Sequence, residues 1–250
     1  MEKNALITGS GIRIGRAIAL KLAQEGWNIA LHYNHSLNET LQLQNDIQAL
    51  GRKAIIIQGD LEDSTCTQTI FQQAKAQLGI ISSLINNASV FDQDDIKTLT
   101  DTSFTRHMMV NLLAPTLLSQ LFAAQTDLTA NHNGSIINII DQRIHNLHAD
   151  FMSYTLSKSA LWTLTQMSAM SLAPEIRVNA IGPGPTLQSK RQSPDQFMRQ
   201  CQQLPLRKGP APEEIANGVF FLINSPSITG EFISMDGGQH LPSSAVDEKE

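Results

Sequence analysis

Tyr154 and Lys158 are four residues apart in a stretch with helical spacing, so their side chains should lie on one face of a helix. A tyrosine hydroxyl has an ordinary pKa of about 10, and a nearby ammonium group stabilises the phenolate and lowers that pKa. We therefore expect Tyr154 to give or take a proton. The spacing is common, so its value depends on where the pair lies in the fold.

A glycine-rich turn near the start of the chain could bind a phosphate group. Gly9, Gly11 and Gly15 lie between a strand-like run and a helix-like run. Glycines allow a sharp bend and a close approach of the backbone to a pyrophosphate, which then lies at the positive end of the following helix. In this context the turn predicts a dinucleotide site.

The end of the second predicted strand indicates which dinucleotide binds. An Asp or Glu there would accept hydrogen bonds from the ribose hydroxyls and would repel a 2′-phosphate. Residues 32–36 contain no carboxylate, and Asn34, His35, Ser36 and the nearby Arg13 offer donors. This favours NADP(H). The alternative is that Arg13 is a solvated residue at a helix start and His35 a residue of a surface loop.

The elements that must position these residues alternate along the chain. Short apolar runs predict strands at 4–8, 28–32, 54–58, 83–86, 135–140, 177–181 and 232–235. Helical patterns cover 13–24, 38–50, 64–78, 104–125, 151–171 and 212–223, with Ser64 as a cap of the third. We expect a single Rossmann-type α/β domain over 1–241, with a doubly wound, parallel, seven-stranded sheet covered by helices on both faces.

Two segments fit no such element. Residues 182–204 contain several prolines and a predicted short helix at 195–204, which is typical of a mobile lid over a substrate site. Residues 242–250 form a polar tail that we expect to be flexible.

Composition restricts the function. The net charge of -5, with no run of Lys or Arg, argues against nucleic-acid and membrane-surface partners and favours small molecules. No apolar run approaches about 20 residues, so no transmembrane helix is expected. Cys66 and Cys201 are too few for a disulfide framework, and the histidines lack metal-ligand spacing, so we expect a cytoplasmic protein without a metal.

Taken together, these motifs resemble those of the short-chain dehydrogenase/reductase family over nearly the whole chain. Several markers occur in the same order as in that family. They are the turn at 8–15, Asp60 with Leu61, the segment 86–89, Asn111, Tyr154 with Lys158, the segment 177–184, and the glycines at 230, 237 and 238.

The resemblance implies roles for individual residues. Asp60 would contact the adenine, Lys158 would hold the nicotinamide ribose, and Asn111 would support a water connected to Lys158. The implied catalytic set is Asp141, Tyr154, Lys158 and Asn111. The implied cofactor-binding set is Gly9, Arg13, Ile14, Gly15, Asn34, His35, Ser36, Asp60, Leu61, Asn87, Ala88, Tyr154, Lys158, Pro183, Gly184 and Thr186.

Two departures resemble a subgroup, the pteridine and dihydromonapterin reductases. Arg13 replaces a glycine of the turn, and Asp141 replaces the catalytic serine thirteen residues before Tyr154. An ionised Asp only accepts hydrogen bonds, which suits the N–H groups of an amino-pteridine better than a ketone oxygen. The resemblance implies Arg13, Phe91, Asp141 and Tyr154 as substrate contacts, with Phe91 stacked on the pterin. The alternative is that Asp141 is turned away and another residue replaces the serine.

We therefore predict a reductase in which NADPH delivers a hydride to a C=N bond of a dihydropterin-type substrate and Tyr154 supplies the proton. Two alternatives stay open. One is a carbonyl reductase of the same family, such as a 3-oxoacyl thioester reductase, and the other is a sensor or scaffold that binds NADP(H) without turnover. The resemblance also implies a homotetramer, assembled through the helices at 104–125 and 151–171 and the last strand.

Overall fold

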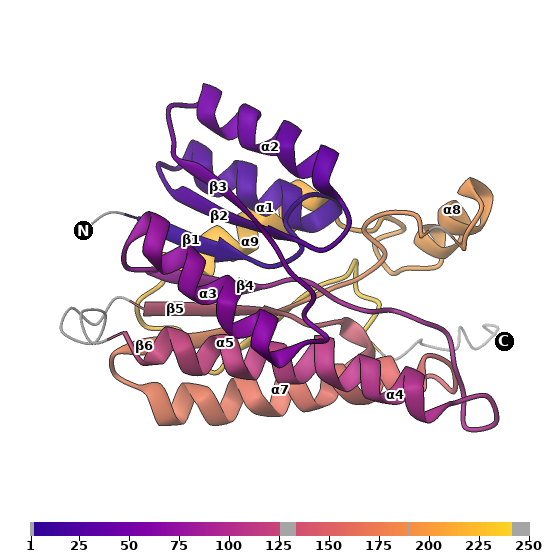
Figure 1. Ribbon diagram of the computed structural model, residues 1–250. Helices are drawn as coiled ribbons and strands as arrows, with labels where there is room; N and C mark the ends of the chain where they lie inside the picture. Colours follow the sequence, from indigo (N-terminus) through magenta and orange to yellow (C-terminus); the bar gives the residue numbers. More distant parts are fainter. Residues whose placement is uncertain (1–2, 126–133, 190, 242–250) are drawn as a thin grey trace, which may run out of the picture.

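The computed structural model describes residues 3–125, 134–189 and 191–241. Within them, seven parallel strands form one sheet in the order β3-β2-β1-β4-β5-β6-β7 (Figure 1). The strands are β1 (Asn4–Ile7), β2 (Asn28–Tyr33), β3 (Ala54–Gln58), β4 (Ser83–Asn86), β5 (Gly134–Ile139), β6 (Ile176–Pro183) and β7 (Phe232–Met235). The chain order changes direction between β1 and β4, which is where a doubly wound sheet opens a crevice for ligands.

Helices cover both faces of this sheet (Figure 1). One face carries α1 (Arg13–Gln24), α2 (Leu37–Ala49) and α9 (Pro212–Ile223). The other carries α3 (Ser64–Leu78), α4 (Asp101–Met108), α5 (Ala114–Ala123) and α7 (Met152–Leu172). The predicted fold class is confirmed.

The strands are apolar because both of their faces are buried. Leu6 packs among the side chains beneath α3 and α5, and its neighbour Ile7 packs beneath α1 and α9. Ile136 and Ile137 divide in the same way on β5. Successive strand side chains point to opposite faces, so a continuous apolar run is what a doubly covered strand requires.

Helix α3 begins at Ser64 as predicted, but the predicted capping residue was wrong by one position. Asp63, not Ser64, lies at the N-cap, and its carboxylate accepts hydrogen bonds from the backbone N–H groups of Thr65 at 2.7 Å and Cys66 at 3.3 Å. A carboxylate at this position also interacts favourably with the positive end of the helix.

The single helix predicted at 104–125 is interrupted. A π-helical turn, η1 (Met109–Leu113), separates α4 from α5, and the N–H of Ala114 donates to the carbonyl of Met109, five residues earlier. Pro115 explains the break, because it has no N–H to give to the carbonyl of Asn111, four residues before it. The π-helical turn therefore contains Asn111, a residue of the predicted catalytic set.

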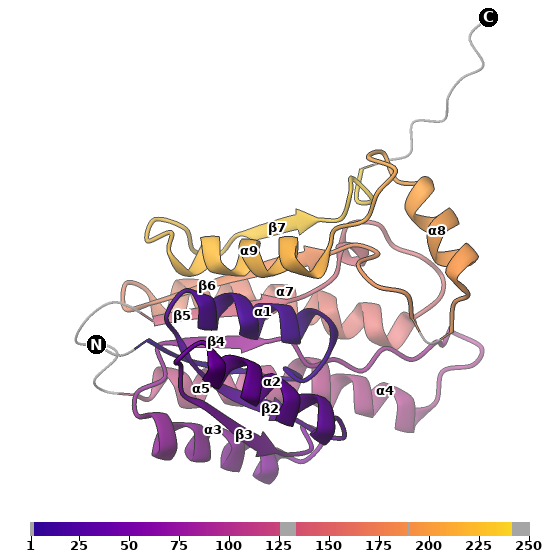
Figure 2. The same ribbon diagram turned by 90° about the horizontal axis from the view of Figure 1, so that it is seen from above.

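The other predicted bounds agree within two residues. β6 runs to Pro183, so the first two residues of the predicted lid belong to a strand, and the lid helix is α8 (Pro194–Gln202). This helix stands away from the sheet (Figure 2). The predicted tail at 242–250 lies outside the described residues, and in the part of the chain that is described no helix has the length and apolarity to cross a membrane.

Candidate active site

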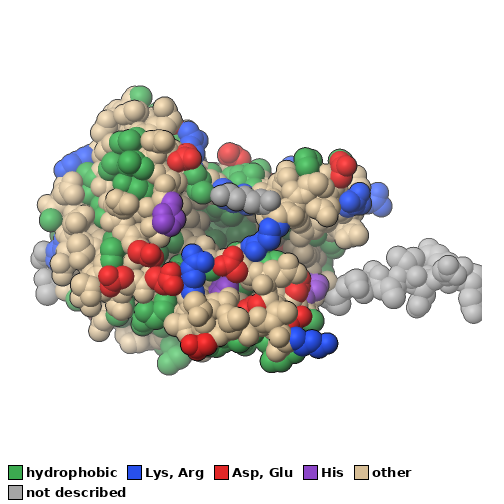
Figure 3. Space-filling model, turned by 45° about the vertical axis from the view of Figure 1, so that its right-hand side comes forward, with side chains coloured by type: hydrophobic (Ala, Val, Ile, Leu, Met, Phe, Trp, Pro, Cys, Tyr) green, Lys and Arg blue, Asp and Glu red, His purple; other side chains and the backbone are tan. Residues whose placement is uncertain are grey.

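The predicted site residues gather where the parallel strands end. The glycine turn follows β1, residues 34–36 follow β2, residues 60–61 follow β3, residues 87–91 follow β4, and Asp141 lies two residues after β5. Because all the strands run in the same direction, these segments meet at one edge of the sheet. Figure 3 shows the molecule turned so that the side carrying α8 comes forward, and this face is hollowed between α8 and the body.

The glycine turn fits a pyrophosphate. Gly9 has a φ of +61°, and a Cβ on it would lie 3.0 Å from the Cα of Ala88. A Cβ on Gly15 would lie 2.2 Å from the carbonyl oxygen of Gly9. Helix α1 then begins without a side-chain cap and without an acidic residue in its first turn. Its N–H groups therefore remain to bind an anion.

Thr8 joins this turn to the segment after β4, and we did not single it out from the sequence. Its hydroxyl oxygen accepts hydrogen bonds from the N–H groups of Asn87 at 2.9 Å and Ala88 at 3.0 Å. The amide of Asn87 donates in return to the carbonyls of Thr8 at 2.9 Å and Gly9 at 3.0 Å. The two sides of the crevice are thus held together by four hydrogen bonds.

His32 is a second residue that the sequence reasoning missed. It is buried, its Nδ1 accepts from the N–H of Gly9 at 3.1 Å, and its Nε2 lies 3.1 Å from the carbonyl of Gly59. Burial lowers the pKa of His32 to about 4, although the Gly59 carbonyl and Asp60 oppose that shift. The neutral imidazole can therefore accept and donate at once and fix the turn against the end of β3.

The residues predicted at the phosphorylated ribose surround the start of α2. His35 is exposed, and Ser36 lies at the N-cap, where its carbonyl accepts from the hydroxyl of Thr40 at 2.6 Å. Asn34 accepts from Gln58 through its main-chain carbonyl at 3.3 Å. These residues lie together, and their contact with the cofactor stays a prediction.

The predicted adenine contacts lie just beyond β3. The carboxylate of Asp60 accepts from the N–H of Glu62 at 3.0 Å, and the side chain of Leu61 is buried.

Arg13 lies between the glycine turn and the lid. Its backbone has a φ of +55°, the left-handed conformation that a glycine would adopt without strain. Its guanidinium donates to the carbonyls of Leu187 at 3.0 Å and Gln188 at 2.9 Å, while the next residue, Ile14, packs partly buried against the core. Arg13 thus reaches the first residues of the lid, and its predicted bonds to the cofactor and the substrate stay predictions.

Asp141 and Tyr154 are in direct contact, so Asp141 is not turned away from the site. The tyrosine hydroxyl donates to one carboxyl oxygen of Asp141 at 2.8 Å, and the other oxygen accepts from the N–H of Arg143 at 2.9 Å. Tyr154 comes from the first turn of α7, and Asp141 from the residue before a short 3₁₀ turn, η2 (Gln142–Ile144). The two residues form one acid–base pair.

The expected lowering of the Tyr154 pKa is wrong for this arrangement. Burial raises the pKa of Tyr154 well above 10, and the charge and hydrogen bond of Asp141 raise it further. Burial also raises the pKa of Asp141, against the lowering effect of its hydrogen bonds and of the nearby cations. Both groups therefore hold protons more strongly than they would in water, so the pair keeps a proton at neutral pH and releases it less readily than a free tyrosine and aspartate would.

Lys158 lies one helical turn after Tyr154, as the spacing predicts. Its ammonium group is buried, donates to the carbonyl of Ile139 at 2.8 Å, and lies 5.8 Å from the centre of the Tyr154 ring. Burial lowers the pKa of Lys158 to about 8, and Asp141 opposes that shift. At neutral pH the site therefore contains a cation, while the positive charge that lowers the Tyr154 pKa, against burial and Asp141, is that of Arg143.

Asn111 uses its side chain to hold neighbouring segments. Its Oδ1 accepts from the N–H of Val90 at 2.8 Å, and its Nδ2 donates to the carbonyl of Val90 and to the hydroxyl of Ser157, each at 3.0 Å. The Ser157 hydroxyl donates to the carbonyl of Tyr154 at 2.7 Å. The side chain of Asn111 thus joins the segment after β4 to helix α7, and its predicted bond to a water stays a prediction.

Phe91 stands beside the acid–base pair. Its ring lies edge to face with Tyr154, with centroids 4.6 Å apart at 76°, and stacks on Phe151, with centroids 4.3 Å apart at 4°. The guanidinium of Arg143 lies 4.8 Å from the centre of the Phe151 ring. Phe151 has a φ of +56°, a backbone conformation that is strained for a non-glycine residue and of a kind that clusters at functional sites. The sequence reasoning did not identify Phe151.

The last predicted cofactor residues begin the connection to the lid. Pro183 ends β6, and the N–H of Gly184 donates to the carbonyl of Met235 at 3.0 Å. A Cβ on Gly184 would lie 2.7 Å from the Cα of Asp236, so only glycine fits against the end of β7. The hydroxyl of Thr186 donates to the carbonyl of Gly184 at 3.0 Å.

Known proteins with solved structures resemble the whole chain. It is 41% identical to the FolM alternative dihydrofolate reductase 1 of Brucella canis, crystallised with NADP, over 99% of this chain and 97% of that one, with a TM-score of 0.93. The Brucella suis FolM, also in complex with NADP, is 42% identical over 98% of each chain, with a TM-score of 0.92.

Another relative is named as a 3-oxoacyl reductase rather than a dihydrofolate reductase. The 3-oxoacyl-[acyl-carrier-protein] reductase FabG of Staphylococcus epidermidis is 28% identical, over 96% of this chain and 100% of its own. A family model described as short chain dehydrogenase matches residues 3–197. With the strand order, the glycine turn and the Tyr154–Lys158 helix in agreement, the chain belongs to the short-chain dehydrogenase/reductase family.

Proposed function

We propose that this oxidoreductase uses NADPH to reduce a dihydropterin-type substrate. The observation that carries the proposal is the hydrogen bond between Tyr154 and Asp141 beside the ring of Phe91. A carboxylate at this position offers acceptors to the N–H groups of an amino-pteridine, and it repels the negative charge that develops on a ketone oxygen during reduction. One face of the Phe91 ring stacks on Phe151, and the other would offer a stacking surface for a planar heterocycle.

The cofactor is NADP(H). Three features of the chain agree with it: the uncapped start of α1, the close approach of Gly9 to Ala88, and the lack of a carboxylate at 32–36. The two FolM proteins with NADP bound support the same assignment. When bound, NADPH supplies the hydride.

The chain's own residues would bind and orient the reactants. We assign the pyrophosphate to the glycine turn and Arg13, the phosphorylated ribose to Asn34, His35 and Ser36, and the nicotinamide ribose to Lys158. The carboxylate of Asp141 would orient the substrate by accepting hydrogen bonds from the substrate's N–H groups, while Phe91 covers one face of the substrate ring. Asp141 can do this without leaving Tyr154, because each carboxylate oxygen accepts more than one hydrogen bond.

The proton would come from the hydroxyl of Tyr154. The raised pKa values of Tyr154 and Asp141 keep a proton at this pair around neutral pH, and the ammonium of Lys158 compensates the negative charge left when the proton departs. Reduction of a C=N bond requires one hydride and one proton, and this pair provides the proton next to the substrate ring.

A substrate comparison tests the proposal. Purified protein should oxidise NADPH in the presence of dihydrobiopterin, dihydromonapterin or dihydrofolate, and Asp141→Ser should reduce this activity. If the wild type reduces an acetoacetyl thioester well and none of the pterins, and Asp141→Ser increases that ketone turnover, the carbonyl reductase alternative is correct. If the protein binds NADP(H) without turning over any of these substrates, and Tyr154→Phe alters only binding, the sensor alternative is correct.

Three further predictions belong to this proposal. The predicted lid at 182–204, whose first two residues end β6, would close over the substrate in a single domain covering 1–241, and the protein would act in the cytoplasm. It would form a homotetramer through the helices α4, α5 and α7 and strand β7. Exposed apolar side chains on α7 support such an interface, among them Leu156, Met167 and Met170.

A further inference from the structure

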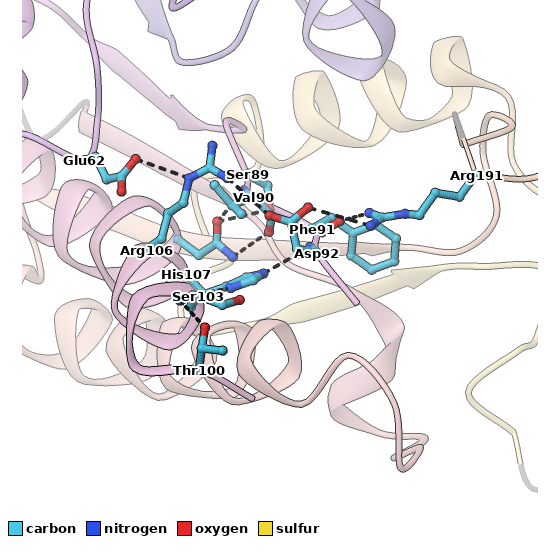
Figure 4. A network of polar contacts seen from close by, with 11 residues as sticks. Glu62, Ser89, Val90, Phe91, Asp92, Thr100, Ser103, Arg106, His107 and Arg191 are labelled. Atoms are coloured by element: carbon cyan, nitrogen blue, oxygen red, sulfur yellow. Dashed lines mark hydrogen bonds and ion pairs between the residues drawn. The ribbon is translucent and has the colours of Figure 1, made fainter. Parts of the chain in front are cut away.

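The segment that carries Phe91 is held by side chains of the neighbouring helix. Residues 89–92 form no regular strand, yet their backbone is bonded as if a partner strand were present. The side chain of Asn111 bonds to both the N–H and the carbonyl of Val90. The Nε2 of His107 accepts from the N–H of Asp92 at 3.1 Å (Figure 4). His107 and Asn111 are four residues apart, so they face the same side.

His107 can make this contact in one protonation state only. Its Nδ1 lies 2.7 Å from the carbonyl oxygen of Ser103, which can only accept, so Nδ1 carries the proton. Its Nε2 must then be the bare nitrogen, because the N–H of Asp92 can only donate. The imidazole is fully buried, and both of its nitrogens are used.

These bonds fix the direction of Phe91. In an extended segment, the backbone groups of residues i and i+2 point to the same side, and those of residue i+1 point to the other. Val90 and Asp92 both face the helix, and the carbonyl of Phe91, on the opposite side, accepts from the guanidinium of Arg191 in the lid (Figure 4). The ring of Phe91 then lies against Phe151 and Tyr154.

We infer that His107 is a positioning residue for the substrate ring: by binding the backbone of Asp92, it sets the place of Phe91 and thus the affinity for a planar substrate. The inference rests on the proposed function, in which Phe91 stacks on the substrate. The adjacent residue Arg106 also holds Asp92, because its guanidinium lies 3.3 Å from the carboxylate of Asp92.

Two substitutions at one position test this role. His107→Leu removes the acceptor for the Asp92 N–H, and the KM for dihydropterin should rise roughly three- to tenfold, the change that one lost buried hydrogen bond produces. The kcat should change less, and the Kd for NADPH should stay at the wild-type value, because His107 does not touch the glycine turn. His107→Gln places an amide oxygen at a similar reach and should restore most of the wild-type KM.

Thr100→Ala is the matched control for helix stability. The Thr100 hydroxyl oxygen caps α4 by accepting from the N–H of Ser103 at 3.1 Å, and it makes no bond to residues 89–92 among the described contacts. Its loss should lower the melting temperature without raising the KM. A KM that rises equally in Thr100→Ala and His107→Leu, or that His107→Gln fails to restore, would refute the positioning role.

Phe91→Ala separates this inference from the function on which it rests. If the wild type turns over dihydropterin and Phe91→Ala raises the KM, while His107→Leu leaves it unchanged, only the role of His107 is refuted. If the wild type neither binds nor turns over any dihydropterin, the proposed function fails and the inference fails with it.

Discussion

Lys158 should destabilise the folded protein at neutral pH. Burial lowers its pKa from 10.5 to about 8, with Asp141 acting against the shift. The unfolded chain therefore binds more protons than the folded chain between these two values, and stability should rise as the pH increases from about 8 to 10.5. The pKa difference corresponds to about 3 kcal/mol, by which the buried charge lowers the unfolding free energy below pH 8.

Replacing Lys158 by Met tests this reasoning. The substitution removes the buried charge but also the hydrogen bond to the carbonyl of Ile139, which contributes about 1 kcal/mol. The variant should therefore be inactive yet about 2 kcal/mol more stable than the wild type at pH 7. Lys158→Gln retains an N–H donor without the charge, and is the matched variant that separates the two contributions.

The assay is urea denaturation at equal protein concentration, so that any subunit association contributes equally. The difference in unfolding free energy between Lys158→Met and the wild type should be largest near pH 7 and should decline as the pH approaches about 10, because the wild-type lysine then loses its charge. A variant less stable than the wild type at pH 7, or a difference that does not change with pH, would refute the assigned pKa and its cause.

Three further predictions concern the same crevice. His32→Leu removes the acceptor for the Gly9 N–H, so fluorescence titration should show about tenfold weaker NADPH binding. Because burial lowers the pKa of His32 to about 4, the wild type should lose stability as the pH falls from 6.5 to 4, and the variant should lose less. An equal loss in both proteins would contradict this. Arg13→Gly and Arg13→Ala both lose the guanidinium bonds to residues 187 and 188 and should both weaken NADPH binding, but only Arg13→Gly relieves the left-handed backbone. Its unfolding free energy should therefore exceed that of Arg13→Ala by about 1 kcal/mol, and equal melting temperatures of the two variants would argue against strain. Asp141→Asn removes a charge that raises the pKa of Tyr154. In a Tyr33→Phe background, Tyr154 is the only remaining tyrosine, and tyrosinate absorbance should begin at a lower pH in Asp141→Asn than with Asp141 present. An unchanged onset would exclude this effect.

Local patterns were sufficient for the elements and for most of the site. The strand at 54–58 and the helix at 13–24 have their predicted bounds, because apolar periodicity reflects which side of an element is buried. The interruption near Asn111 was also readable, since Pro115 was present in the predicted helix. We missed it because the helical pattern continues on both sides of the proline.

The contacts within the site could not be read from spacing. Phe91 and Phe151 are sixty residues apart, and only the packing of the segment after β4 against the start of α7 stacks their rings. His107 lacked metal-ligand spacing and looked unremarkable, because its partner is the backbone of Asp92, which no sequence motif marks.

The sequence by itself determined the family, the class of fold and the glycine turn predicted for NADP(H). It also determined that Asp141 follows a strand and that Tyr154 and Lys158 share one helix. These features depend on residue type and local period, which the chain carries directly. Only the tertiary structure decided the protonation of that set. Burial raises the pKa values of Tyr154 and Asp141 and lowers that of Lys158, and burial is a property of the surrounding fold rather than of the motif.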